Sequence, residues 1–247
     1  EQGISEPSGV DDWKPLHRAG NNDEESIWHQ FFNENFNDIM AHGGAGLLLV
    51  DMLKKDQDGR LSIYFSQSVY NSGDYSAFND SIVGTAPYDT LPPPYPSHLN
   101  QDTFGAEDWG VQWVSWHENQ FIKMECQYKL GQESNARNTL NNTLLAMESN
   151  WQEVDSLCIL PRYGNMNSED LFAAIMNEKY KAMFLNMQAL SDWRRTGYPV
   201  FLDRSGNSTE CISGTPRRLP YSDLEKSANS NAPTGDSIYD RVQNDPN

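Results

Sequence analysis

The sequence predicts a mostly α-helical protein, a scaffold of tetratricopeptide-like hairpins that carries long irregular loops. Apolar residues recur at spacings of three and four over residues 118–147 and again from residue 168 onward, which is typical of amphipathic helices. Residues 66–117 are instead rich in proline, glycine and polar residues, which excludes a long helix and most central strands. A chain of 247 residues, 37% of them hydrophobic, is long enough to bury a core.

The N-terminal part predicts a polar segment followed by two short helices. Residues 1–24 carry scattered Gly, Pro, Asn and Asp without a sustained period, so a loop or mobile segment is expected there. From Ile27 apolar residues fall near one helical face, and the glycines at 43 and 44 separate them from a second apolar run, Leu47 to Leu53. The apolar residues of the first face are Trp28, Phe31, Phe32, Phe36, Ile39 and Met40.

Residues 118–147 predict a helical hairpin that turns at Gly131. The apolar positions are Phe121, Met124 and Tyr128 on the first helix, and Ala136, Leu140, Leu144 and Met147 on the second. The hairpin is of the tetratricopeptide type, although one pair of helices does not establish a repeat array.

A further helix is expected to begin at Asn167 or Ser168, since Asp170 follows Asn167 at capping distance. Gly197 and Pro199 provide the left-handed residue and the stop that commonly follow a helix, which places Arg194 and Arg195 in its last turn. An apolar stripe runs along this helix and is predicted to be core. Its members are Phe172, Met176, Tyr180, Met183, Met187 and Leu190.

Charge and motifs exclude several function classes. The chain has 35 acidic and 18 basic residues and a net charge of -17, which disfavours nucleic acid but not a neutral ligand such as a sugar. Neither a phosphate-binding loop nor a dinucleotide fingerprint nor a zinc motif is present, so no metal and no cofactor are expected. Cys126, Cys158 and Cys211 have no disulfide or zinc spacing and are interpreted as packing residues.

The stretch KKDQDGRLS, residues 54–62, has some features of a calcium loop. Aligning Gly59 with the glycine of an EF-hand puts Lys54 at the first ligand position and Phe65 where a bidentate Glu is required. The EF-hand pattern therefore fails at both ends. An exposed turn after a helix is expected instead.

Aromatic residues in and beside the proline-rich loop are the candidate ligand contacts. Trp109 and Trp113 lie four apart, and Trp116 follows three residues later. They form either a platform on which a sugar ring stacks or a helix face packed into the core. Tyr88 and Tyr95, within the loop, complete the candidate ligand-binding set.

Two arginine pairs, Arg194 with Arg195 and Arg217 with Arg218, require carboxylates or carbonyls for their donors. They are interpreted as a buried network that joins the last helix to the C-terminal segment, with an anionic-ligand site as the alternative. The acidic residues considered as partners are Glu118, Glu125, Glu178 and Glu225.

Two motifs carry a resemblance to a known family. NEKYKAMFLNMQALSDWRRTGYP followed by TPRRLPYSDLEKSANSN resembles the C-terminal half of the SusD/RagB family of outer-membrane nutrient-binding lipoproteins, and residues 113–136 are similar to that family's helix pair. The resemblance extends from about residue 27 to the end. Its motif residues are Trp193, Arg194, Arg195, Gly197, Tyr198, Pro199, Arg217, Arg218, Tyr221 and Glu225, and Ser222 stands where the family often has Pro.

The resemblance implies a helical domain over residues 25–247, with the family's N-terminal half and its lipid-bearing cysteine outside this chain. It implies a protein on the cell-surface face of the outer membrane, held there only by a lipid anchor. Such a protein binds an oligosaccharide or peptide without catalysis and delivers it to a SusC-like TonB-dependent transporter. From the residues alone, a glycoside hydrolase and a tetratricopeptide-type protein-binding scaffold remain alternatives.

Overall fold

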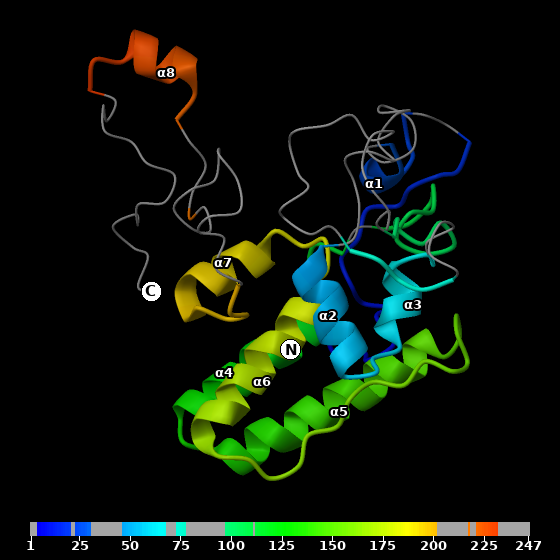
Figure 1. Cartoon of the computed structure of the whole chain (residues 1–247), viewed down its shortest axis with the longest axis vertical. Helices are drawn as coiled ribbons and strands as arrows, with labels where there is room; N and C mark the ends of the chain where they lie inside the picture. The colour runs from blue at the N-terminus through cyan, green and yellow to red at the C-terminus, as the bar shows by residue number, and fades with distance from the viewer. Residues whose placement is uncertain are drawn as a thin grey trace. The chain divides into compact units, whose positions relative to one another are not determined.

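The computed structural model describes residues 4–20, 23–30, 46–67, 73–77, 97–110, 112–201, 217 and 221–231. The chain forms two compact units, residues 1–186 and 187–247. All regular elements of the described residues are helices (Figure 1), which confirms the predicted fold class. The first unit holds α1 (Ile27–His29), α2 (Leu47–Lys55), α3 (Arg60–Tyr64), α4 (Trp116–Lys129), α5 (Glu133–Trp151) and α6 (Ser168–Ala182). The second holds α7 (Gln188–Thr196) and α8 (Asp223–Ala228).

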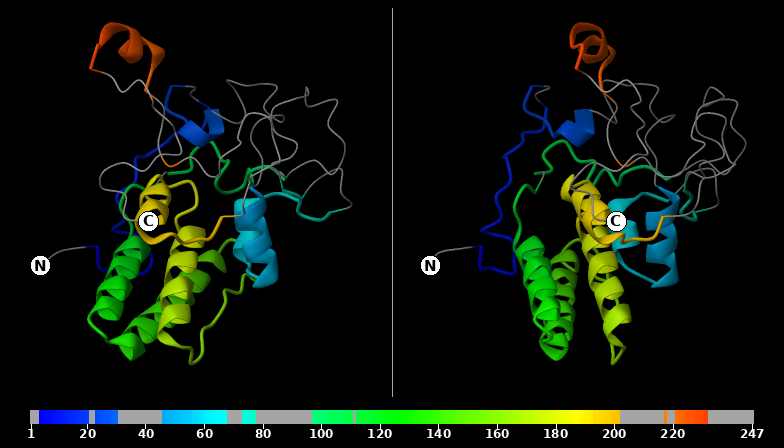
Figure 2. Two further views of the ribbon diagram at one scale, coloured as in Figure 1. Left: turned by 60° about the vertical axis from the view of Figure 1, so that its left-hand side comes forward. Right: turned by 90° about the vertical axis from the view of Figure 1, so that its left-hand side faces the viewer.

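The predicted hairpin is present as α4 and α5, and α6 lies alongside both (Figures 1 and 2). The turn is at Gly131, whose φ of 73° favours glycine. The predicted apolar positions are buried: Phe121 and Met124 on α4, and Leu140 and Leu144 on α5. These three helices form the core of the first unit because each presents one apolar stripe to the other two.

The helix α6 begins as predicted but ends earlier. Its cap is Asn167, whose side chain accepts the Asp170 N–H at 2.8 Å. Met183 is buried, whereas Met187 is 87% exposed, so the prediction of one helix with a core stripe as far as Leu190 is wrong. The helix ends at Ala182, and Leu185, three residues later, has a φ of 61°, which turns the chain away from the helical path. Packing of the neighbouring Phe184 on Tyr64, with ring centroids 4.7 Å apart, outweighs the local apolar period.

The helix α7 has the predicted C-terminus. Gly197 has a φ of 77°, and its N–H donates to the Trp193 carbonyl at 2.7 Å. Arg194 and Arg195 lie in the last turn, as expected. In the same unit, the Ser222 side chain accepts the Glu225 N–H at the start of α8, so the serine at the position where the family often has Pro is a helix cap.

The turn between α2 and α3 is held by a close backbone approach. The Gly59 N–H donates to the Ile159 carbonyl at 2.8 Å. A Cβ at Gly59 would lie 2.7 Å from both the Cys158 Sγ and the Ile159 nitrogen. This turn therefore requires glycine for space, not for its backbone angles, since φ is -63°.

Segments predicted to be irregular are irregular where the structure describes them. Residues 4–20 form no helix, and Trp13 makes one isolated antiparallel bridge with Val114. The described parts of residues 66–115 are also without helices, and α4 begins at Trp116. Most of the predicted first helix after His29 lies outside the described residues, as do Tyr88 and Tyr95.

Candidate functional site

A cavity of about 140 Å³ in the first unit is the candidate site. It lies between the N-terminal segment, the start of α4, the end of α5 and the residues that follow α6. Segments distant in the sequence therefore supply its walls. Much of the lining is aromatic, and the aromatic residues are Trp28, Tyr64, Phe104, Trp109, Trp116, Trp151 and Phe184.

The aromatic wall is preorganised by contacts between rings. Trp109 lies nearly parallel to Trp151, with centroids 6.1 Å apart and planes 15° apart. The centroid of the Phe104 ring is 4.6 Å from the ring centroid of Trp109 and 6.0 Å from that of Trp151. Offset aromatic pairs of this kind are favourable, so the wall exists before a ligand arrives.

Polar groups on the same cavity come mainly from Asp12 and its partners. One carboxylate oxygen of Asp12 accepts the Trp116 backbone N–H at 2.7 Å, and the other accepts the Gln112 amide at 3.1 Å. Burial raises the pKa of Asp12, partly offset by the Trp116 hydrogen bond. On the opposite wall, the Asn150 amide donates to the Pro7 carbonyl at 2.7 Å. The N-terminal segment is thus tied to both helices of the hairpin.

His117 also lines the cavity. Burial lowers the pKa of its imidazole to about 4, and the positive charge of Arg60 acts in the same direction. The ring is therefore neutral at pH 7, with one donor and one acceptor nitrogen. Sequence reasoning noted this histidine only when excluding a metal motif.

The structure separates the predicted tryptophans. Trp109 lines the cavity, whereas Trp113 is 60% exposed and pairs edge-on with Trp13, which is 61% exposed, at 5.7 Å. The described residues 109, 110 and 112–115 are not helical, so the alternative of a shared helix face is wrong. Trp116 is the first residue of α4 and lies on the cavity with Trp109.

In the second unit, the arginine cluster is organised by Arg217. Its guanidinium lies 4.9 Å from the centroid of the buried Trp193 ring and donates to the Arg194 carbonyl at 3.3 Å. Arg195 pairs with Asp192 at 2.7 Å within α7, and its side chain is 40% exposed. Arg195 therefore lies at the surface, contrary to the expectation of a buried ion pair.

The remaining motif residues have mixed environments. Pro199 is buried, and the peptide bond between Tyr198 and Pro199 is cis. Tyr198 is half-buried, and Tyr221 and Glu225 are exposed. Arg218 lies outside the described residues.

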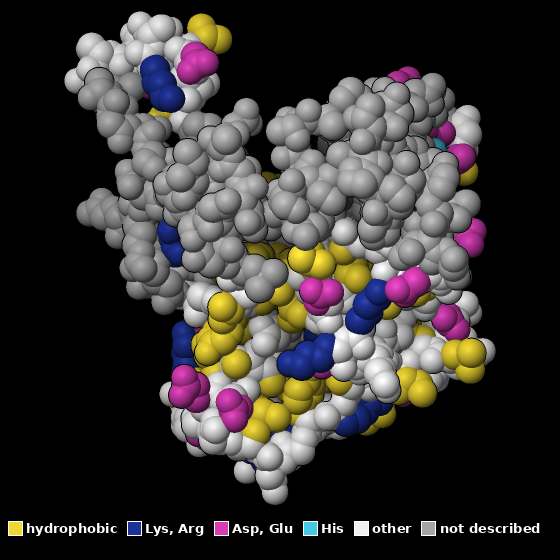
Figure 3. All heavy atoms as spheres, viewed as in Figure 1, with side chains coloured by type: hydrophobic (Ala, Val, Ile, Leu, Met, Phe, Trp, Pro, Cys, Tyr) yellow, Lys and Arg dark blue, Asp and Glu magenta, His cyan; other side chains and the backbone are white. Residues whose placement is uncertain are grey.

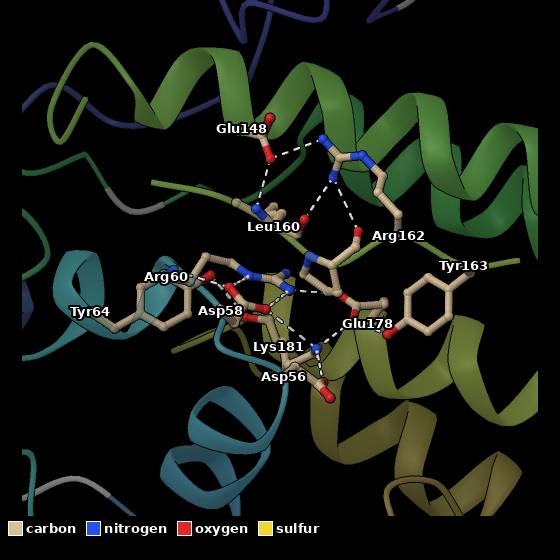
Figure 4. A network of polar contacts seen from close by, with 11 residues as sticks. Asp56, Asp58, Arg60, Tyr64, Glu148, Leu160, Arg162, Tyr163, Glu178 and Lys181 are labelled. Atoms are coloured by element: carbon tan, nitrogen blue, oxygen red, sulfur yellow. Dashed lines mark hydrogen bonds and ion pairs between the residues drawn. The ribbon is translucent and has the colours of Figure 1, made fainter. Parts of the chain in front are cut away.

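A buried ionic network that sequence reasoning missed lies beside the turn between α2 and α3 (Figure 4). The Arg60 guanidinium donates two hydrogen bonds to the Asp58 carboxylate, at 2.9 and 2.5 Å, and one to the Glu178 carboxylate at 2.5 Å. Lys181 bonds to Asp56 at 2.8 Å and also pairs with Asp58 and Glu178. The side chains of Asp58, Arg60, Glu178 and Lys181 are all 0% exposed.

The predicted turn after α2 is present and residues 54–57 are exposed, but Asp58 and Arg60 are buried, so the prediction of an exposed turn is wrong for the second half of KKDQDGRLS. Burial alone would raise the pKa of Asp58, but the charge and hydrogen bonds of Arg60, with Lys181, hold it below its usual value. Glu178, expected as a partner of the motif arginines, bonds instead to Arg60 and Lys181, and it accepts the Tyr163 hydroxyl at 2.5 Å. The sequence pattern that could have indicated this is an acid and a lysine at i and i+3 on a buried face of α6.

These charges form a structural network and not a metal site. The ammonium of Lys181 and the guanidinium of Arg60 stand among the carboxylates where a cation would bind. Within the described ranges, no group of three acidic, histidine or cysteine side chains is arranged to hold a metal ion.

Two further sequence expectations concern cysteines and the surface. Cys158 is buried as expected of a packing residue, and burial raises its pKa to about 12, whereas Cys126 is exposed and Cys211 lies outside the described residues. In the view of Figure 3, the described part of the surface carries acidic and basic side chains interspersed with apolar ones. Of the described helices, none has the length and apolarity needed to cross a membrane.

Comparisons with solved structures agree on the fold. A SusD homolog from Bacteroides uniformis superposes with a TM-score of 0.66 at 17% identity, covering 90% of this chain and 51% of that one. A SusD homolog from Bacteroides fragilis has a TM-score of 0.64 at 17% sequence identity, and the superposition covers 89% of this chain and 52% of that one. A chitin-binding protein has a TM-score of 0.56 at 19% sequence identity, and the superposition covers 89% of this chain and 52% of that one. The chain thus spans about half the length of these structures. No curated protein sequence matches it.

The family comparison covers most of the chain. The model of the SusD-like family, described as starch-binding and associating with the outer membrane, matches residues 15–222. That span includes the hairpin, the two arginine pairs and the cavity lining from Trp28 to Asn186, whereas the lining residues Pro7 to Asp12 lie before it. The chain belongs to this SusD-like family.

Proposed function

We propose that this chain is part of a cell-surface protein that binds a glycan, or another oligomeric nutrient, and delivers it to a SusC-like TonB-dependent transporter in the outer membrane. The observation that carries the proposal is the aromatic cavity on the helical scaffold, in a family described as starch-binding. Trp109 and Trp151 offer indole faces against which the C–H face of a sugar ring can stack. Gln112, Asn150 and His117 offer hydrogen bonds to its hydroxyl groups.

The composition of the cavity favours binding over hydrolysis. Glycoside hydrolases generally use two carboxyl groups on either side of the scissile bond. Among the described residues that line the cavity, Asp12 is the one carboxylate, and both of its oxygens already accept hydrogen bonds. The ligand is therefore expected to leave the protein unchanged.

The proposed attachment at the cell surface and delivery to a transporter are supported by the family description, which gives association with the outer membrane. Extraction of the native protein from membranes under mild detergent should bring down a large barrel protein. Recovery of the protein without any such partner would contradict the proposed delivery.

A panel of soluble oligosaccharides tests the binding role directly. We expect at least one oligosaccharide to bind in a calorimetric titration and to be recovered intact after prolonged incubation. Shortened products would favour a glycoside hydrolase. Binding of proteins but of no oligosaccharide or peptide would favour a tetratricopeptide-type scaffold.

A matched pair of tryptophan variants locates the site. Trp109→Ala removes a stacked wall of the cavity and should weaken binding by about 2 to 4 kcal/mol, the range of aromatic anchors. Trp113→Ala removes an exposed indole outside the cavity lining and should change the affinity far less. Equal losses in the two variants would place the ligand elsewhere. Thermal unfolding of each variant controls for damage to the fold.

A further inference from the structure

We propose that the cavity selects an uncharged sugar ring, and that Pro7 and Asp12 set this selectivity by holding the amides of Gln112 and Asn150 by their NH₂ groups, so that the amide oxygens accept from sugar hydroxyls. The inference rests on the proposed function. Beyond that function, it specifies that the bound sugar ring is uncharged and names the residues that recognise the ring. It also gives the N-terminal segment, interpreted from the sequence as a loop, a role in the site.

The two amides are oriented by the same short segment. Gln112 uses its NH₂ group on the Asp12 carboxylate at 3.1 Å, and Asn150 uses its NH₂ group on the Pro7 carbonyl at 2.7 Å. A side-chain amide has two N–H donors and one carbonyl oxygen, and each of these bonds uses one N–H, so the bonds fix which end of the amide is the carbonyl and leave both carbonyl oxygens as acceptors for the ligand. Two fixed acceptors suit a ligand that donates, as sugar hydroxyls do.

The charge of the cavity discriminates against acidic sugars. Among its described lining residues there is neither Lys nor Arg. Its one ionisable acid is Asp12, and its one histidine, His117, is neutral at pH 7 because burial lowers the pKa of the ring to about 4. A carboxylate or sulfate on the ligand would lose its hydration without gaining a cation from these lining residues, and it would meet Asp12 and two amide oxygens. Lys14, whose charge acts on Asp12, and Arg60, whose charge acts on His117, do not line the cavity.

The size of the cavity limits what enters it. About 140 Å³ is well below the roughly 300 to 1,000 Å³ of pockets that enclose drug-sized molecules. One sugar ring is the unit that matches this space, with the remainder of the oligosaccharide outside. The selectivity therefore acts on one ring of the chain.

Pairs of oligosaccharides that differ only in charge test the selectivity. We would titrate maltohexaose against its C6-carboxylated form, and chitohexaose against a C6-carboxylated chitohexaose, at 150 mM salt. The expected result is binding of at least one neutral member, with its acidic counterpart weaker by about tenfold or more. An acidic member that binds as tightly as its neutral counterpart would overturn the inference and leave the proposed function intact. If nothing binds in either series, neutral or acidic, the proposed function fails first.

Neighbouring aspartates provide a matched test of the positioning role. Asp12→Ala removes the partner of Gln112, whereas Asp11→Ala removes the same charge from an exposed residue one position earlier. Asp12→Ala should weaken neutral binding about tenfold and lower the ratio of neutral to acidic affinity, while Asp11→Ala leaves both within about twofold.

A purely structural role for Asp12 would lower both affinities equally and keep their ratio, which would contradict the proposal. Should the alanine variant fail to fold, Asp12→Asn provides the second test. It keeps an acceptor for the Trp116 N–H but loses the charge. The ratio must fall in Asp12→Asn as well, and an unchanged ratio would refute the assignment.

Discussion

Replacing Lys181 by Met is expected to destabilise the first unit by about 3 to 5 kcal/mol. The network holds three carboxylates, from Asp56, Asp58 and Glu178, against the two cations Arg60 and Lys181, so its formal charge is -1. Removing the ammonium makes it -2, since Asp56 loses its cation and the fully buried Asp58 and Glu178 are left to share Arg60. Such an excess of buried negative charge is strongly unfavourable. Methionine keeps most of the side-chain volume, so a cavity contributes little to the loss.

The matched control is Lys54→Met. Lys54 also pairs with an aspartate, Asp74, at 3.2 Å, but it is 37% exposed and its partner 63%. Surface pairs of this kind contribute about 0 to 1 kcal/mol. The same chemical change at the two lysines therefore separates the effect of burial from the effect of losing a charge.

Urea unfolding followed by circular dichroism measures both variants at pH 7 and pH 4. Because the pKa of Asp58 is held low by Arg60 and Lys181, its stabilisation is present above the unfolded pKa of about 3.9 and is lost as the pH falls through the lower folded pKa. The penalty of Lys181→Met should shrink in acid, as the unpaired carboxylates take up protons. Equal free energies of unfolding for Lys181→Met and Lys54→Met at pH 7 would refute the reasoning.

Three further predictions concern single residues. His117 has a folded pKa of about 4 against about 6.5 unfolded, so stability should fall as the pH drops from 6.5 to 4, by at most about 3 kcal/mol, and a pH series of urea titrations on His117→Gln should lack this component. Arg195→Ala should change the free energy of unfolding by less than about 0.5 kcal/mol because its ion pair is exposed, whereas Arg217→Ala, which loses the contact with the Trp193 ring, should lower it by about 1 to 2 kcal/mol. A larger loss in Arg195→Ala than in Arg217→Ala would support the expectation from the sequence that Arg195 is a buried structural residue. Gly131→Ala should cost about 1 to 2 kcal/mol in chemical unfolding because φ is 73°, and a neutral result would contradict the need for glycine in the hairpin turn.

Local patterns predicted the parts of this fold that depend on local physics. The hairpin followed from the apolar period of α4 and α5 and from Gly131 between them. The cap at Asn167 and the left-handed Gly197 followed from the residue types that helix ends prefer. The end of α6 did not follow, because it depends on Phe184 packing against Tyr64, a residue 120 positions earlier in the chain.

The candidate site was only partly predictable for the same reason. Trp109 was a candidate from its place beside the proline-rich loop, and it lies in the cavity. Its partner Trp151 is at the end of α5, and the amide of Asn150 is fixed by Pro7, 143 residues away. Spacing along the chain contains no information about such pairs. The ionic network was missed likewise, since Arg60 and Glu178 meet only in the folded structure.

The absence of a side chain at Gly59 has an electrostatic consequence. The backbone of residues 158 and 159 lies directly against this glycine, and the turn that contains it carries Asp58 and Arg60 on either side. A methyl group at residue 59 would push the backbone of the turn away from residues 158 and 159. Water would then reach four ionised side chains that have no solvent exposure in the structure. The local dielectric constant would rise, and the attraction between those charges would weaken severalfold. One missing methyl group thus controls how strongly the buried charges of the first unit attract one another.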